Sequence, residues 1–142
     1  AVSNCFKLIP APEAVKPDRP RSFGLYLKGQ WYRLQLKESI SQETDPVQSL
    51  DISLLAKHLL EPILNITDPR RDPRIDFVGG IRGLKELERR VDSGEMQLAL
   101  TVFPVKMEQL MAVADAKQIM PPKSTWFEPK LADGLVSHLL DA

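Results

Sequence analysis

Apolar residues recur along this chain in two rhythms, and each rhythm predicts a different kind of element. Residues 96–102 alternate apolar with polar or small side chains, which predicts a strand with one buried face. Lys28-Gly29-Gln30 separates two further runs and is typical of a β-hairpin turn, because Gly29 is free to take a positive φ. Besides the strand at 96–102, short apolar runs predict strands at 6–9, 23–27, 31–36 and 75–78.

Apolar spacing of three or four residues predicts three helices. The first runs over 51–63 with Asp51 as its N-cap, and Pro62 kinks or ends it. The second covers 83–90 and stops at Ser93-Gly94. The third has Pro104 in its first turn. Its inward-facing residues are expected to be Met107, Leu110, Met111 and Ala114.

These elements predict an α+β fold, a mainly antiparallel sheet with about three helices packed on it. Residues 1–142 are expected to form a single domain. A second hairpin is expected around Asp133-Gly134, between 125–128 and 135–140. The strand at 96–102 lies in sequence between two amphipathic helices, so one core is expected to hold residues of all three elements. That core comprises Leu98, Leu100, Val102, Leu87, Val91, Met107 and Leu110.

Composition and charge exclude several classes of protein. The chain is 43% hydrophobic and 27% charged, as expected of a globular domain. Lysines and arginines equal aspartates and glutamates at 19 each, so no long-range attraction to nucleic acid or an anionic membrane is expected. No apolar stretch approaches the ~20 residues that span a bilayer.

The few cysteines and histidines argue against a metal site and for the cytoplasm. Cys5 is the only cysteine, so neither an intrachain disulfide nor a Cys-x-x-Cys metal site is available, as is typical of a reducing compartment. His58 and His138 lie far apart and lack acidic ligands at suitable spacing, so no metal is expected. The cofactor is left unknown.

The run from Asp76 to Gly83 is the first candidate site. It is expected to form a short buried strand, a glycine turn with a positive φ at Gly79, Gly80 or Gly83, and a helix start beside Arg82. The first amides of a helix have no intrahelical partner, and a guanidinium beside them adds further donors for an anion.

The chemistry of this turn has two interpretations. In the first, Arg82 and the amides of Gly83 and Leu84 hold an anion. In the second, the glycines only allow close packing and Arg82 pairs with Asp76 or Glu86. Neither the P-loop spacing nor the Gly-x-Gly-x-x-Gly spacing of dinucleotide-binding turns is present.

The second candidate site is the proline-stiffened segment 121–130, which holds two lysines, two hydroxyls, a carboxylate and two aromatics. Its residues that suit an anion are Lys123, Ser124 and Thr125. Its residues that suit a partner surface are Trp126, Glu128 and Lys130. The alternative interpretation is a rigid connector that leads into an edge hairpin.

Several blocks in fixed order, among them 50–55, 59–64, 74–83, 90–96 and 120–131, resemble a known family. The chain is similar, over roughly residues 20–140, to the C-terminal part of a prokaryotic family catalogued as domain of unknown function 1015. Members of that family are longer, and their middle region carries a Gly-His-His-Arg block that resembles nucleotide-handling domains of the chromosome-partition type, including free-serine kinases. That block does not occur in this sequence. The resemblance therefore implies a C-terminal domain without the catalytic block. The start at Ala1, without a methionine, is expected of a trimmed chain or a fragment.

Two classes of function stay open at this point. In the first, the full-length protein is a cytoplasmic enzyme that uses a nucleotide or phosphate, and this domain contributes an anion-binding turn without being catalytic itself. Its partners are then the remainder of the protein and a small phosphorylated ligand, with no nucleic acid and no membrane. In the second, the domain is a structural or protein-interaction module without chemistry.

Overall fold

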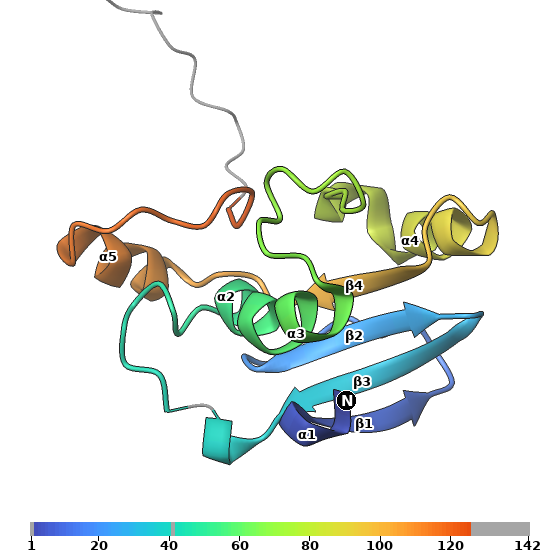
Figure 1. Ribbon diagram of the computed structural model, residues 1–142, viewed down its shortest axis with the longest axis horizontal. Coiled ribbons are helices and arrows are strands. Elements are labelled where there is room, and N and C mark those ends of the chain that lie inside the picture. The colour runs from blue at the N-terminus through green and yellow to red at the C-terminus, as the bar shows by residue number, and fades with distance from the viewer. Residues whose placement is uncertain (1, 41, 126–142) are drawn as a thin grey trace, which may run out of the picture.

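The computed structural model describes residues 2–40 and 42–125. Its centre is one antiparallel sheet of four strands in the order β1-β3-β2-β4 (Figure 1). The strands are β1 (Phe6–Ala11), β2 (Ser22–Leu27), β3 (Gln30–Leu36) and β4 (Leu98–Val102). The helical elements are α1 (Val2–Cys5), η1 (Glu38–Ile40), α2 (Asp51–Leu55), η2 (Ala56–Leu60), α3 (Glu61–Leu64), η3 (Gly80–Arg82), α4 (Gly83–Asp92) and α5 (Met107–Asp115). The α+β class with an antiparallel sheet is therefore confirmed.

The hairpin of β2 and β3 is the most regular part of the sheet. Leu27 pairs with Gln30, and the two residues between them, Lys28 and Gly29, have φ values of 50° and 78°. Positive φ at both turn residues matches the right-handed twist of the flanking strands. The predicted turn is confirmed. The hairpin expected around Asp133-Gly134 lies outside the described residues, apart from Thr125.

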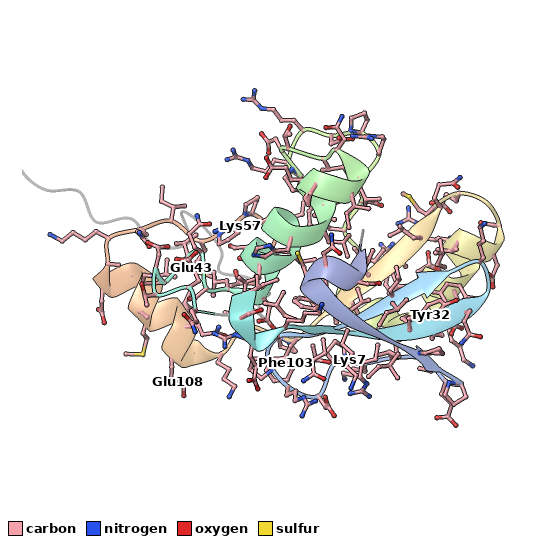
Figure 2. All side chains as sticks on the ribbon, turned by 60° about the horizontal axis from the view of Figure 1, so that its bottom comes forward. Lys7, Tyr32, Glu43, Lys57, Phe103 and Glu108 are labelled. Carbon is pink, nitrogen blue, oxygen red and sulfur yellow. The ribbon has the colours of Figure 1, made fainter. Side chains whose placement is uncertain are left out.

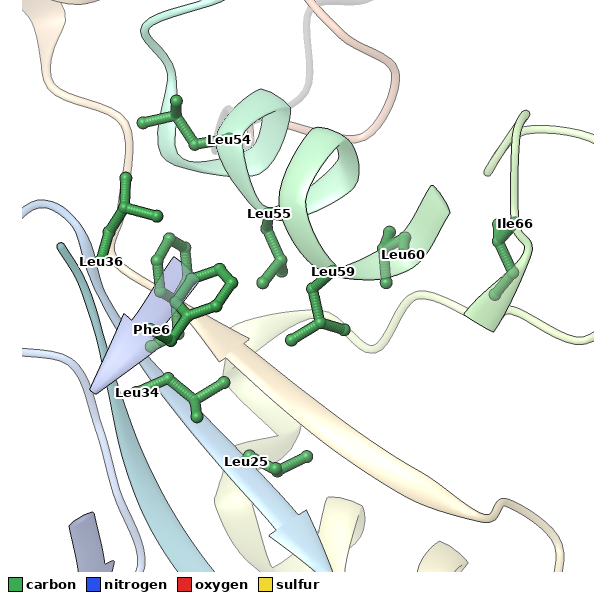
Figure 3. Packing of buried hydrophobic residues seen from close by; sticks show 10 residues of the cluster. Phe6, Leu25, Leu34, Leu36, Leu54, Leu55, Leu59, Leu60 and Ile66 are labelled. Atoms are coloured by element: carbon green, nitrogen blue, oxygen red, sulfur yellow. The ribbon is translucent and has the colours of Figure 1, made fainter. Parts of the chain in front are cut away.

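A continuous helical segment, α2–η2–α3, covers one face of the sheet (Figure 1). Figure 3 shows its leucines, among them Leu55 and Leu59, directed at Phe6, Leu34 and Leu25 of the strands. Burial of these side chains is the main contribution to stability on this face, at about 1.5–3 kcal/mol for each fully buried large apolar residue. The segment ends at Asn65, whose φ of 54° is left-handed.

Asp51 does not cap this helix, contrary to the sequence prediction. The N-cap position is Leu50, and Asp51 is the first helical residue. Its carboxylate instead accepts the backbone N–H of Arg21, with N–O distances of 3.0 and 2.9 Å. Arg21 has a φ of 63°, so the link holds a left-handed residue at the start of β2. The pKa of Asp51 is raised overall. Burial is the main cause, and the hydrogen bond from the backbone N–H of Arg21 offsets only part of the rise.

The opposite face of the sheet carries a second cluster, built on Tyr26, Trp31, Val15 and Ala99. Helix α4 packs against it through Leu84, Leu87 and Val91. The phenol of Tyr26 donates to Asp92 at 2.9 Å, and the indole N–H of Trp31 donates to Glu88 at 2.7 Å. The polar end of each buried ring is therefore satisfied by a carboxylate of α4.

The prediction of one core around β4 is wrong. Leu98, Leu100 and Val102 pack against the cluster of apolar side chains between the sheet and α2–η2–α3 (the first cluster). Ala99 belongs to the second cluster and is the most buried residue of β4. Helices lie on both faces of the sheet, so the two sets of alternating residues in β4 enter different clusters.

Helix α5 is also turned differently from the prediction. Met107 and Met111 are 61% and 58% exposed, and Ala114 is exposed too, while Val113 is buried. The helix begins at Met107, after Lys106 as N-cap, so Pro104 lies outside its first turn. Apolar side chains occur around most of its circumference, so sequence spacing alone does not select the buried side.

Candidate functional site

The glycine turn connects an unpaired segment to α4. Residues 75–79 form no strand, so the prediction of a buried strand at 75–78 is wrong. The segment is held by side chains instead. Asp76 accepts a hydrogen bond from its neighbour's backbone, Phe77 N, and pairs with the guanidinium of Arg90 on α4 at 2.8 Å. Gly83 has a φ of 72°, which confirms the predicted positive φ in the turn.

The amides available at this helix start differ from those expected. The N–H of Gly83 donates to the carbonyl of Gly80, so it is not free for a ligand. Helix α4 has no side-chain cap, and the N–H groups of Leu84 and Lys85, in its first turn, have no acceptor within α4 itself. The backbone groups that could serve as donors to an anion are therefore those of Leu84 and Lys85.

Arg82 forms neither of the ion pairs that the alternative interpretation required. Asp76 pairs with Arg90, and Glu86 pairs with Arg89 at 2.8 Å. Within residues 2–40 and 42–125, exposed Arg82 has no salt bridge. The charge of Arg82 nevertheless helps to lower the pKa of Glu86. Arg89 is the main cause of that shift, and Arg82 is the smallest of the cationic contributions.

The structure brings the second candidate segment to the glycine turn. The ammonium of Lys123 lies 5.1 Å from the centre of the Phe77 ring, and Figure 1 shows the chain before residue 126 beside the loop that leads to η3. A cation over a ring face is stabilised by about 0.5–1 kcal/mol at an exposed site. The hydroxyl of Ser124 donates to the carbonyl of Pro121, and Thr125 is exposed. Trp126, Glu128 and Lys130 lie outside the described residues.

The charges around the turn leave a net excess of cations. Arg90 is the main cause that holds the pKa of Asp76 below its usual range, with Lys123 contributing least, so this carboxylate stays ionised and paired. Asp76 and Glu86, the two acids near the turn, are thus each paired with an arginine, Arg90 and Arg89 respectively. Arg82, Lys85 and Lys123 remain without a salt bridge in the described part of the chain.

A polar pocket that the sequence did not predict lies along the helical segment α2–η2–α3, between the residues that precede it and those that follow it. It has a volume of about 410 Å³. Its lining residues are Gln48, Ser53, Ala56, Lys57, Glu61, Ile66 and Thr67. The loop before α2 forms part of its rim, and Figure 2 shows Glu43 of that loop close to Lys57.

The described residues show no metal centre. In them, no group of three or more histidine, cysteine, aspartate or glutamate side chains is placed to hold a metal ion. His58 is half-buried on the helix, and its burial lowers its pKa, with Lys57 a smaller cause. No described helix has both the length and the apolar character needed to cross a membrane.

Comparisons with known proteins add nothing to this geometry. No family model, curated protein or solved structure matches the chain.

Proposed function

We propose that this chain is an accessory binding domain of a larger cytoplasmic protein and that its glycine turn holds a phosphate group of a small ligand. The resemblance to the C-terminal part of domain of unknown function 1015 supports the accessory role. The single cysteine supports the reducing compartment. Catalytic residues then belong to the remainder of the full-length protein, and the isolated domain has no activity of its own.

The observation that carries this proposal is the unpaired guanidinium of Arg82 at an uncapped helix start. A single exposed ion pair contributes only about 0–1 kcal/mol, so neither Arg82 nor the helix start would hold phosphate well alone. Two backbone amides, a guanidinium and the nearby ammonium of Lys123 together reach about −4 kcal/mol, which corresponds to a millimolar Kd.

The test is a titration of the full chain with inorganic phosphate and with ATP, read by amide chemical shifts. Substitution Arg82→Ala should weaken binding by about tenfold, because it removes the bidentate donor. Lys123→Ala should weaken it less, since Arg82 is the N-cap residue of α4, whereas the ammonium of Lys123 lies over the ring of Phe77. Arg71→Ala is the matched control: Arg71 has the same charge and a side chain that is 90% exposed, and lies in the preceding loop.

The outcomes separate site binding from general attraction. A similar loss in Arg82→Ala and Arg71→Ala would indicate a nonspecific charge effect and would remove the proposal. Equal affinity of Arg82→Ala and the unsubstituted chain would do the same.

A second candidate function, a protein-interaction module, is favoured by the apolar side chains that α5 and its C-terminal flank expose. Besides Met107 and Met111, Ile119 is 88% exposed. Exposed clusters of large apolar side chains are typical of interaction surfaces. If this function holds, backbone amides of α5 exchange hydrogen more slowly in the full-length protein than in the isolated chain.

A further inference from the structure

Lys57, the cation that lines the polar pocket on the helical segment, is paired with a carboxylate outside the lining. The ammonium of Lys57 pairs with Glu43 at 3.2 Å. Glu61, four residues later on the same face of the helix, is exposed, and its carboxylate has no salt bridge or hydrogen bond among the described residues. The free charge that lines this pocket is therefore negative.

The helix itself provides a second acceptor at the same place. In the π-helical turn η2, the N–H of Glu61 donates to the carbonyl of Ala56, five residues back. The next residue, Pro62, has no N–H. The carbonyl of Lys57 would accept from the N–H of residue 61 in an α-helix or of residue 62 in a π-helix. It therefore lacks both of these donors. Helix carbonyls point toward the C-terminus, so this one is directed along the face that carries Glu61. Single π-helical turns are frequent at functional sites.

The remaining lining suits a small organic molecule. Ser53 and Thr67 contribute hydroxyls and Gln48 an amide, while Ile66 and Ala56 offer apolar contact. A volume of about 410 Å³ lies within the range of roughly 300–1,000 Å³ that is usual for small-molecule sites.

We infer that this pocket binds a small organic ammonium ion, with the charge held by the carboxylate of Glu61 and the carbonyl of Lys57. The hydroxyl and amide groups of the pocket then bind polar substituents of the ligand. This site is independent of the proposed phosphate site, and its preferred charge is opposite.

The experiment is an amide-shift titration of the full chain with ethanolamine, which carries one ammonium and one hydroxyl. Saturable shifts are expected at Ser53, Lys57 and Thr67. N-acetylethanolamine, which keeps the hydroxyl but has no charge, should bind at least about tenfold more weakly, because a hydrogen bond to a charged group is lost.

Two variants make the test specific to the pocket. Glu61→Gln keeps the size of the side chain and removes its charge, and it should weaken ethanolamine binding by about tenfold or more. Glu108→Gln is the matched control, since Glu108 is an exposed carboxylate on α5. Unchanged affinity in Glu61→Gln, equal losses in both variants, equal binding of the acetylated probe, or shifts that do not centre on the pocket would each overturn the inference.

Discussion

Replacement of Gly24 by alanine should destabilise the fold severely, because β2 has no room for a side chain at this position. A Cβ atom on Gly24 would lie 2.3 Å from the hydroxyl oxygen of Thr101 and 2.6 Å from the carbonyl oxygen of Val15. These two oxygens are themselves joined, since the Thr101 hydroxyl donates to the Val15 carbonyl at 2.9 Å. The absence of a Cβ is what lets the loop before β2 cross the sheet here.

The expected cost follows from those two contacts. Forcing an extra methyl group into packed structure costs typically 1–3 kcal/mol, and backbone is one of the atoms that must move here. Displacing Thr101 also removes a hydrogen bond with a net value of about 1 kcal/mol. Gly24→Ala should therefore cost about 3 kcal/mol and lower Tm by roughly 10 °C.

The assay is denaturant unfolding with Gly80→Ala as the control. A Cβ on Gly80 meets nothing within 4 Å, and Gly80 does not have a positive φ, so that variant should stay within about 0.5 kcal/mol of the unsubstituted chain. In the double variant Gly24→Ala with Thr101→Ala, the cost should be less than the sum of the single costs, since one clash is relieved. A cost for Gly24→Ala no larger than that for Gly80→Ala would refute the described crossing.

Three further predictions concern the segment before η3, the carboxylate of Asp51 and the orientation of α5. Arg90→Met should speed amide exchange over 76–79, because the guanidinium that holds Asp76 is lost; unchanged exchange would contradict this. Asp51→Asn tests whether ionisation of the partly buried Asp51 carboxyl stabilises or destabilises the fold. Because burial raises the pKa of this carboxyl above 3.8, the unsubstituted chain should lose stability relative to the variant as pH rises from 3.8 through the folded pKa; a difference independent of pH in paired denaturation curves would contradict it. Leu54→Ala should cost about 2–5 kcal/mol and Met107→Ala under about 0.5 kcal/mol, and similar costs for the two would show that α5 is turned the other way.

Local signals in the sequence were sufficient for the elements that depend on a few neighbouring residues. The hairpin at Gly29, the positive φ at Gly83 and the stop of α4 at Ser93-Gly94 were all predicted, and each rests on backbone freedom within a short turn. The α+β class followed from the same local patterns.

Features that depend on distant residues were not predicted. The burial of Ala99 requires that a second helix cover the other face of β4, and alternation within one strand does not reveal this. The carboxylate of Asp51 binds the backbone of Arg21, thirty positions away, rather than its own helix. The loop before η3 is held by Arg90 through a side chain and forms no strand.

The phosphate turn and the polar pocket at Lys57 differ in the same way. The residues of the phosphate turn were named from the sequence, but the use of Gly83's own N–H within the turn was visible only in the structure. The pocket at Lys57 was missed, because it requires the π-helical turn before Pro62 and the return of the chain through Ile66.

The most direct test of the central claim is a map of amide shifts on saturation of the full chain with inorganic phosphate. We expect the largest saturable shifts at Leu84 and Lys85, with a smaller one at Lys123 and none at Ser53 or in the pocket around it. Largest shifts in the pocket, or shifts that grow linearly and are spread over the whole surface, would contradict the claim that the start of α4 is an anion site.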